Sequence, residues 1–384
     1  MLQPVGIAPT AFQAVPATVR IDGQDYPNPL RFDNGTAVTT AAEWEGRRRA
    51  ELLAQFRQNV YGQDLPLPTA ETVQVTSTAF PGGTRKVVKI TVTGPRGTGS
   101  FPLTLFVPKT VGKPKGTFLL IDHRGSVSAD PAQSSGYAPV ATIVKAGYAF
   151  ASFKAGDIAP DDNGTYRNKM INLFYRADQP LPDNAGRTIS AWAWGASRVL
   201  DYFETDPAVD AKHVALIGHS RLGKTVLWAG AQDPRFAVVL SSCAGEMGSS
   251  LARRDFGETV DDMATGFPWQ FAGNFQAFIG HWTAMPTDTH MVIALNAPHG
   301  LYIDGGVGDQ WSDPEGEFLG EVAAGPAYRL VGKKDLGTST LPAVDHPLID
   351  GDLAFQYHHE AHVIAASDWQ AFLQFAARYL QPAR

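Results

Sequence analysis

Apolar residues follow two different patterns along the chain. Between residues 74 and 109, apolar and polar positions alternate, most clearly at 86–92 and 103–107, which predicts strands with one buried face. Farther on, the apolar runs are short and continuous, which is typical of strands buried on both faces of a parallel sheet. Such strands are expected at residues 117–121, 149–153, 214–217, 238–240 and 301–303.

Apolar residues also recur every three or four positions, which predicts amphipathic helices. In residues 187–204, for example, Ile189, Trp192 and Ala196 begin one apolar stripe. Helices are expected at 41–60, 187–204, 288–297 and 368–380. Residues 1–40, rich in Pro, Gly and Thr, are expected to form an extended arm. The alternation of strands and helices predicts one α/β domain over residues 1–384, with a mostly parallel sheet and an antiparallel N-terminal extension.

Composition narrows the classes of partner. The formal charge of −6 argues against a nucleic-acid or membrane-surface partner, because both need a basic face. No run reaches the roughly 18 apolar residues of a spanning helix. The first residues lack the charged start and apolar core of a signal peptide. With Cys243 as its one cysteine, the chain has no intrachain disulfide framework.

The segment from Gly218 to Thr225 carries the chemistry and fits two catalytic patterns. It reads Gly-His-Ser-Arg-Leu-Gly-Lys-Thr directly after an apolar run. A serine in this setting predicts a nucleophile elbow of the G-x-S-x-G kind, here with the second glycine one position later and Ser220 on a sharp strand-to-helix turn. The same letters match G-x-x-x-x-G-K-T, a phosphate-binding loop. The two interpretations predict acyl transfer and nucleotide hydrolysis.

The phosphate-loop interpretation lacks its other parts. Such a loop needs an acidic residue at the end of another strand to hold magnesium. The strand expected at 238–240 is instead followed by Ser241-Ser242-Cys243, and several expected strands precede the motif. The elbow is therefore favoured, and a nucleotide hydrolase stays as a remote alternative.

An elbow serine needs a later carboxylate and then a histidine, in that chain order. The histidine takes the proton of the serine, and the carboxylate fixes the orientation of the imidazole. The downstream candidates are the acids Asp304, Asp309 and Asp313 in one loop, and the histidines His358, His359 and His362 before the last expected helix.

Several residues allow other interpretations. His346, in a loop before a proline, is a rival base. His358 and His362 have the spacing of a metal pair on a helix, but no third ligand is evident, so no metal is expected. Trp192 and Trp194 are expected in the core rather than on a sugar-binding platform.

At this point the sequence resembles the glucuronoyl esterases, carbohydrate esterase family 15. The likeness spans nearly the whole chain, and the S-R-x-G-K signature at Ser220 is its most specific part, because ordinary lipases lack an arginine directly after the nucleophile. The segments that carry it are residues 43–44, 47–48, 60–62, 190–198, 206–210, 218–224, 228–233, 235–237, 252–259, 309–314, 316–318, 362 and 368–369.

The resemblance implies an α/β-hydrolase fold, a three-layer sandwich around the central sheet. It implies a serine esterase that cleaves the ester between (4-O-methyl-)glucuronic acid of glucuronoxylan and lignin alcohols, without a cofactor. Ser220 would be the nucleophile, His362 the base, and Arg221 a stabiliser of the oxyanion. The residues implied to contact the uronic acid are Lys224, Glu258 and Trp311.

The acid is the position that departs from part of the family. Some members resembling this chain carry a catalytic glutamate just after the strand that follows the elbow, where Cys243 stands here. Others use an aspartate in the Asp-Gln-Trp loop, which makes Asp309 the expected acid and Glu246 the reserve. Residues 267–271 and the loop 122–125 also differ from the usual pattern, and substrate preference is expected to reflect this.

Other points stay open at this stage. An acetyl xylan esterase or another carbohydrate esterase with the same triad is the nearest alternative activity. The chain is expected to act as a monomer. The resemblance implies a secreted or periplasmic enzyme, although no signal peptide is recognised in this sequence.

Overall fold

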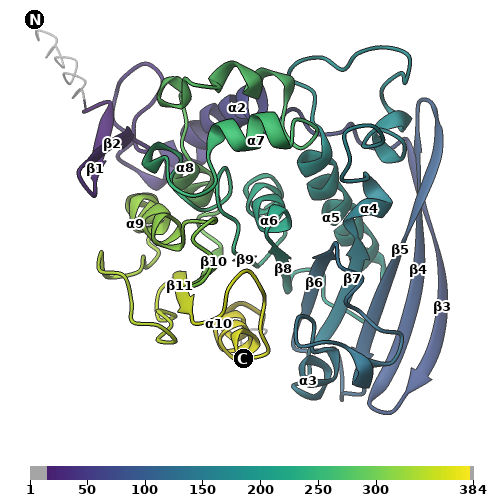
Figure 1. Ribbon diagram of the computed structural model, residues 1–384. Coiled ribbons are helices and arrows are strands. Elements are labelled where there is room, and N and C mark those ends of the chain that lie inside the picture. The colour runs from purple at the N-terminus through teal and green to yellow at the C-terminus, as the bar shows by residue number, and fades with distance from the viewer. Residues whose placement is uncertain (1–14, 381–384) are drawn as a thin grey trace, which may run out of the picture.

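A nine-stranded mixed sheet runs through the computed structural model, which describes residues 15–380 (Figure 1). Its strand order is β11-β10-β9-β8-β6-β7-β5-β4-β3. The strands are β3 (Ala70–Phe80), β4 (Gly83–Gly94), β5 (Gly97–Pro108), β6 (Thr117–Asp122), β7 (Ala149–Lys154), β8 (Val214–His219), β9 (Val238–Ser242), β10 (Gly300–Gly306) and β11 (Leu353–His358). Strands β6 to β11 are parallel to their neighbours among themselves, whereas β3, β4 and β5 pair antiparallel.

The two apolar patterns of the sequence correspond to these two parts of the sheet. Every residue of β6, β8 and β10 is buried, as expected for strands covered on both faces. β4 is buried at alternate positions, and the edge strand β3 is almost wholly exposed. All the strands expected from the sequence are present, most of them extended by a few residues.

Helices cover both faces of the sheet. One apolar cluster joins α5, α6, α8 and α9 to one face, and a second joins α3 and α10 to the other. The α-helices are α1 (Ala41–Glu43), α2 (Arg49–Asn59), α3 (Val140–Lys145), α4 (Ala155–Ile158), α5 (Thr188–Thr205), α6 (Arg221–Gln232), α7 (Val260–Gly266), α8 (Thr289–Ala294), α9 (Pro314–Leu330) and α10 (Asp368–Leu380). The arrangement confirms the α/β class and the layered architecture.

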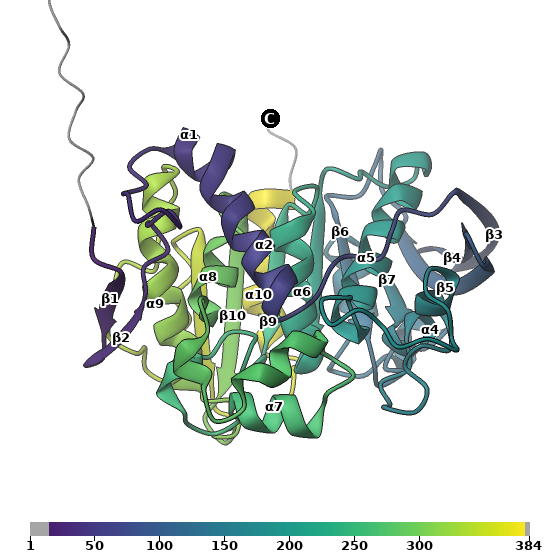
Figure 2. The same cartoon turned by 90° about the horizontal axis from the view of Figure 1, so that it is seen from above.

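The expected helices at 41–60, 187–204 and 368–380 are present, the first with a π-helical turn over Trp44–Arg48. The helix expected at 288–297 ends earlier, at Ala294. The extended arm expected for residues 1–40 is wrong for part of that segment, because β1 (Thr18–Ile21) and β2 (Gln24–Pro27) form a hairpin. Residues 1–14 of the arm lie outside the described residues. The hairpin and the strands β3–β5 lie at opposite ends of the molecule (Figures 1 and 2).

The helix that follows the elbow, α6, packs against buried aromatic side chains. Trp228 of α6 is fully buried and stacks on Tyr61, with 4.6 Å between ring centroids, and its indole N–H donates to Ser190 of α5. Trp192 and Trp194 of α5 are also buried, which confirms the expectation that they belong to the core. Among the described residues, no helix is both long and apolar enough to cross a membrane.

Candidate active site

Ser220 lies on a strained turn between β8 and α6. Its backbone angles, φ 60° and ψ −130°, are unusual for a residue with a side chain, and such strain is typical of a nucleophile elbow. A Cβ at Gly218 would overlap the carbonyl oxygen of Leu222, and a Cβ at Gly223 would lie 2.9 Å from the Cβ of Ala244. The turn therefore requires glycine at both positions around the serine.

His362 and Asp309 form a short hydrogen bond. They lie in loops after β11 and β10, and 2.6 Å separates His362 Nδ1 from Asp309 Oδ2. Burial by itself would raise the pKa of Asp309, but hydrogen bonds from His362 and Ser312 bring it below the usual value. The carboxylate is buried, whereas the imidazole side chain is 37% exposed. This pair therefore presents an accessible imidazole whose Nδ1 is held by an ionised acid.

The His362 ring packs against His219, the residue directly before Ser220, with 4.5 Å between the ring centroids. His219 is buried, and burial keeps its pKa well below the usual value, so the ring is neutral. Arg124, in the loop after β6, lies 3.1 Å from His219 Nε2. Because a guanidinium only donates, Nε2 accepts, and Nδ1 donates to Ser242 Oγ at 3.1 Å. His219 thus links three strand ends beside the nucleophile.

Arg221, the first residue of α6, is held by Asp161. Its guanidinium forms an ion pair with Asp161 Oδ2 and lies 5.4 Å from the centroid of the Phe267 ring. The other oxygen of Asp161 accepts from the Trp269 indole at 2.7 Å and from the Gln270 amide at 2.8 Å. The segment 267–271, which departs from the pattern of the resembling sequences, therefore orients the cation next to Ser220.

The three residues expected to contact a uronic acid lie together. Lys224 Nζ lies 2.7 Å from Glu258 Oε2, and the Trp311 indole donates to Glu258 Oε1 at 3.3 Å. Lys224 and Glu258 are largely buried, but the Trp311 ring is 53% exposed. A charged pair capped by an accessible aromatic face is suited to binding the hydroxyl groups and ring of a sugar.

The alternative candidates do not join this arrangement. Lys224 Nζ also donates to the carbonyls of Ala244 and Glu246, so it is fully occupied and unlike a phosphate-loop lysine. His346 lies in the loop between α9 and β11, away from the elbow segment. His358 is the last residue of β11 and His362 lies in the loop beyond it, so the pair is not on a helix as the spacing suggested.

Glu246, the reserve acid, is buried, and its backbone carbonyl accepts a hydrogen bond from Lys224 Nζ. Burial, with the nearby Asp288 carboxylate, raises its pKa well above the usual value. No hydrogen bond joins Glu246 to His362 within the described part of the chain. The geometry therefore favours Asp309 over Glu246 as the partner of the imidazole.

A second set of polar side chains lies next to the His362–Asp309 pair, deeper in the protein. Cys243 after β9, Asp304 in β10 and His358 in β11 are all buried. Burial disfavours a charged His358 ring, but the Asp304 and Glu360 carboxylates outweigh this and raise the pKa of His358 to about 9. Burial, with the nearby Asp304 carboxylate, raises the pKa of the Cys243 thiol well above its usual value.

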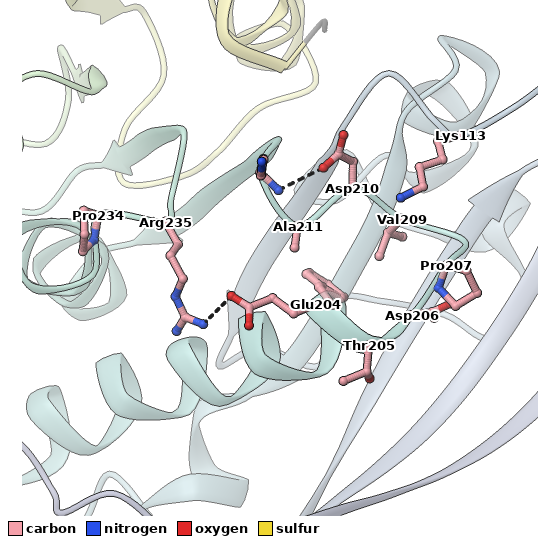
Figure 3. A pocket seen from close by; sticks show the side chains of 12 residues that line it. Lys113, Glu204, Thr205, Asp206, Pro207, Val209, Asp210, Ala211, Pro234 and Arg235 are labelled. Atoms are coloured by element: carbon pink, nitrogen blue, oxygen red, sulfur yellow. Dashed lines mark hydrogen bonds and ion pairs between the residues drawn. The ribbon is translucent and has the colours of Figure 1, made fainter.

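A surface pocket of about 650 Å³ lies at the amino ends of the parallel strands, the end away from Ser220 (Figure 3). It is formed by the segment between α5 and β8, with Lys113 and Arg235 at its borders, and Arg235 is paired with Glu204 there. The proposed nucleophile follows the carboxyl end of β8, whereas this pocket adjoins its amino end. The pocket is therefore not part of the site around Ser220.

Sequence reasoning missed several of these residues. Asp161 gave no signal, because its role depends on a contact with a residue 60 positions away. Arg124 lies in the loop 122–125, whose unusual sequence was the available signal. His219 stood inside the elbow motif, but nothing in the sequence indicated that its ring would contact the expected base.

The chain order of these elements defines the class. The elbow, the acid and the histidine follow β8, β10 and β11 of a mostly parallel sheet in that chain order, and all lie at its carboxyl end, where α/β folds bind ligands. This is an α/β-hydrolase.

Comparison with known proteins narrows the class to a family. The family described as "Glucuronyl esterase, fungi" matches residues 88–332. A carbohydrate esterase, MZ0003, from an unknown prokaryotic organism is 33% identical over 92% of this chain and 89% of its own. A 4-O-methyl-glucuronoyl methylesterase of Wolfiporia cocos is 29% identical over 87% of this chain and 79% of its own. The chain belongs to the glucuronoyl esterases, carbohydrate esterase family 15.

A solved structure agrees with this assignment. The glucuronoyl esterase from Solibacter usitatus has a TM-score of 0.85 and 36% sequence identity to this chain, and the match covers 92% of this chain and 98% of that one. The fold and the family expected from the sequence are therefore confirmed.

Proposed function

We propose that the protein hydrolyses esters of (4-O-methyl-)glucuronic acid, such as those joining glucuronoxylan to lignin alcohols, through an acyl-enzyme on Ser220. The observation that carries the proposal is the 2.6 Å hydrogen bond between His362 and Asp309, from loops beside the elbow. Family membership supports the substrate class, because a relative is named for 4-O-methyl-glucuronoyl ester cleavage.

In the first half of the reaction, Ser220 Oγ attacks the ester carbonyl at carbon 6 of the uronate. His362 Nε2 takes the proton of the hydroxyl, because its Nδ1 is already held by Asp309. The tetrahedral intermediate then collapses, the C–O bond to the alcohol breaks, and the alcohol leaves with the proton from His362. The ionised Asp309 stabilises the imidazolium that forms between these two transfers.

The negative charge on the carbonyl oxygen is met by donors at the start of α6. The backbone N–H of Arg221 has no acceptor within its helix, because it belongs to the first turn. The Arg221 guanidinium adds a fixed positive charge, oriented by Asp161. In the second half of the reaction, water attacks the acyl carbon while His362 takes its proton, and Ser220 is released.

Substrate recognition is assigned to Lys224, Glu258 and Trp311. Lys224 holds the Glu258 carboxylate in place, the remaining acceptor capacity of that carboxylate serves the sugar hydroxyls, and the exposed Trp311 ring gives a flat apolar surface for the sugar. No metal or organic cofactor enters this mechanism.

The test compares turnover of methyl or benzyl glucuronate with turnover of galacturonate esters and of acetylated xylan. The proposal expects the glucuronate ester to be preferred, and Ser220→Ala to lower kcat by at least about 10³-fold. Full activity of Ser220→Ala would end the proposal. A preference for acetylated xylan would support the acetyl esterase alternative, which shares the same triad.

The place of action and the oligomeric state are also proposed. We infer from the family resemblance that this protein is exported, and we propose that it acts as a monomer with a single catalytic domain. Size-exclusion chromatography with light scattering tests the monomer: a mass near the 41.3 kDa of one chain is expected.

A further inference from the structure

Three buried side chains meet at the carboxyl ends of three neighbouring strands. Cys243 Sγ lies 3.8 Å from Asp304 Oδ1 and 3.9 Å from His358 Nε2. His358 Nε2 and Asp304 Oδ1 are 3.7 Å apart. The three atoms therefore form a nearly equilateral triangle, and each residue is at most 1% exposed.

Only weak hydrogen bonds hold this triangle, because the Cys243 thiol contacts Asp304 Oδ1 and His358 Nε2 at the long limit for sulfur and has a single proton to donate. A separation of 3.7 Å between a ring nitrogen and a carboxylate oxygen is too long for a hydrogen bond. The second oxygen of Asp304, Oδ2, is buried and has no hydrogen-bond partner among the described residues. A buried carboxylate is costly unless a cation or donors compensate it, and the His358 ring lies near Oδ1 only, so Oδ2 of Asp304 is left without compensation.

The triangle has the dimensions of one face of a zinc site. Zinc lies about 2.0–2.3 Å from nitrogen, oxygen and sulfur ligands, so ligand atoms around one ion are separated by about 3.3–3.8 Å. A sulfur and a nitrogen or oxygen ligand are expected about 3.5 Å apart, and a nitrogen and an oxygen ligand about 3.3 Å apart. The three observed separations are a few tenths of an ångström longer, so small side-chain shifts would close the triangle on an ion. One thiolate, one imidazole and one carboxylate are also the ligand types that zinc accepts together.

The contact of the other ring nitrogen of His358 also fits a metal site. Glu360 Oε2 lies 3.2 Å from His358 Nδ1. A carboxylate on the second ring nitrogen is the usual support of a metal-bound histidine, because it fixes the ring and makes the other nitrogen a better ligand. The sequence gave no sign of this site, since the partners of His358 come from two other strands.

Two neighbouring groups of potential ligands are weaker candidates. Asp309 and His362 also lie near Cys243, but they already bond to each other at 2.6 Å. Asp368 lies near His358 and Glu360, but its oxygens already accept from Gln356 at 3.1 Å and from the Ala365 N–H at 2.7 Å.

We propose that Cys243, Asp304 and His358 bind one Zn²⁺ ion, with Glu360 supporting His358. The ion ties together the ends of β9, β10 and β11, the strands whose following loops supply Asp309 and His362. Its role is structural, and it takes no part in ester cleavage. The inference stands whether or not the proposed substrate is correct, because it rests on different residues.

Metal analysis of tag-free protein tests the site. Protein dialysed against zinc and then against metal-free buffer should retain one Zn²⁺ per chain by elemental analysis. Replacement by Co²⁺ should give a thiolate-to-cobalt charge-transfer band and the visible bands of a four-coordinate ion. Cys243→Ser should abolish the charge-transfer band, and Glu360→Gln should weaken zinc binding about 10- to 100-fold.

His359→Gln is the matched control. His359 is adjacent to the site in sequence, but its side chain is 62% exposed and bonds Asp345, so zinc binding should be unchanged. Absence of stoichiometric zinc, or Co²⁺ bound without a charge-transfer band, would overturn the proposal. If Cys243→Ser does not fold, the spectrum of the wild-type protein alone decides. Esterase turnover is recorded separately, so a failure of the proposed function is not mistaken for a failure of this site.

Discussion

Two buried carboxyl groups near Ser220 have different surroundings. Asp309 accepts a hydrogen bond from an imidazole, and its pKa lies below the usual value. Glu246 is enclosed without such a partner, its pKa is raised, and its Oε1 has no hydrogen bond in the described structure. Asp309 is thus held in its ionised form, whereas burial disfavours the charged form of Glu246, so Asp309 is the better suited to stabilise an imidazolium.

The difference predicts opposite outcomes for two amide substitutions. Asp309→Asn should lower kcat by about 10²- to 10⁴-fold with little change in KM, because the amide cannot hold the working tautomer of His362. Glu246→Gln should leave kcat within a few-fold, since the amide resembles a protonated carboxyl group. Steady-state kinetics on a glucuronate ester measure both, and the reverse order would reassign the acid.

Trp311 predicts a different kinetic signature. Removing its exposed ring in Trp311→Ala should raise KM for glucuronate esters by about 10-fold, corresponding to the 1–2 kcal/mol of a typical aromatic contact. Turnover of a small acetyl ester, which has no sugar to stack on the ring, should be unchanged. Equal losses on both substrates would contradict a sugar-binding role.

At the scale of elements, the sequence predicts best where one principle dominates. Strands β6 and β8 are uninterrupted apolar runs, and α5 has a regular apolar stripe, so all three were predicted. Strand β11 was missed because Gln356 and His358 interrupt its apolar pattern. Gln356 is tolerated in this buried strand because it bonds Tyr302 and Asp368 from other elements.

Helix α9 was missed for another reason. It begins at Pro314 and contains Gly316, Gly320, Gly325 and Pro326, residues that predict a loop. Packing stabilises the helix instead: at Gly320 the helix approaches the carbonyl of Ser249 so closely that a Cβ would overlap it. The contact between Asp309 and His362 was predictable in chain order, whereas the contact of Asp161 with Arg221 depends on this kind of packing.

Asp161, in the loop after α4, is predicted to position the Arg221 guanidinium. Asp161→Asn should lower kcat by about 10-fold with KM nearly unchanged, because the Arg221 guanidinium loses its ionised partner. The same substitution in an Arg221→Gln background should add little, since the two residues act as a unit. Asp157→Asn, which breaks an ion pair between α4 and Lys169 in the segment that follows it, is the control and should be neutral. Additive losses would show that Asp161 acts elsewhere.

At the scale of the whole molecule, the ion pair of Lys86 with Asp206 helps to join the antiparallel strands to the segment that leads into the parallel strands. Lys86 of β4 lies 2.7 Å from Asp206 after α5, which also accepts hydrogen bonds from Tyr202 and the Ala208 N–H. Burial opposes ionisation of Asp206, but these donors lower its pKa overall. The pair lies beside the pocket shown in Figure 3.

Because the pKa of Asp206 is lowered in the folded protein, the stability of the fold depends on pH. A carboxyl group with a lowered pKa in the folded state stabilises the fold above its unfolded pKa of 3.8, and the contribution is lost as pH falls through the folded value. Asp206→Asn should therefore lower the free energy of unfolding by about 1.5–3 kcal/mol at pH 7. The gap between variant and wild type should close in acid.

Urea unfolding followed by tryptophan fluorescence measures this difference. Asp178→Asn, in an exposed pair with Arg176, is the control and should leave the unfolding free energy nearly unchanged, because solvent screens such a pair. A gap that persists unchanged below pH 3 would show that packing, not charge, accounts for the loss.

The sulfur of Cys243 lies within 4.8 Å of both Asp309 and His362. Two adjacent strands, β9 and β10, thus each deliver a side chain to the neighbourhood of the same imidazole. The sheet alone does not fix which strand bears the acid, because a carboxylate at the end of either one would lie close to His362; we propose that β10 supplies it here.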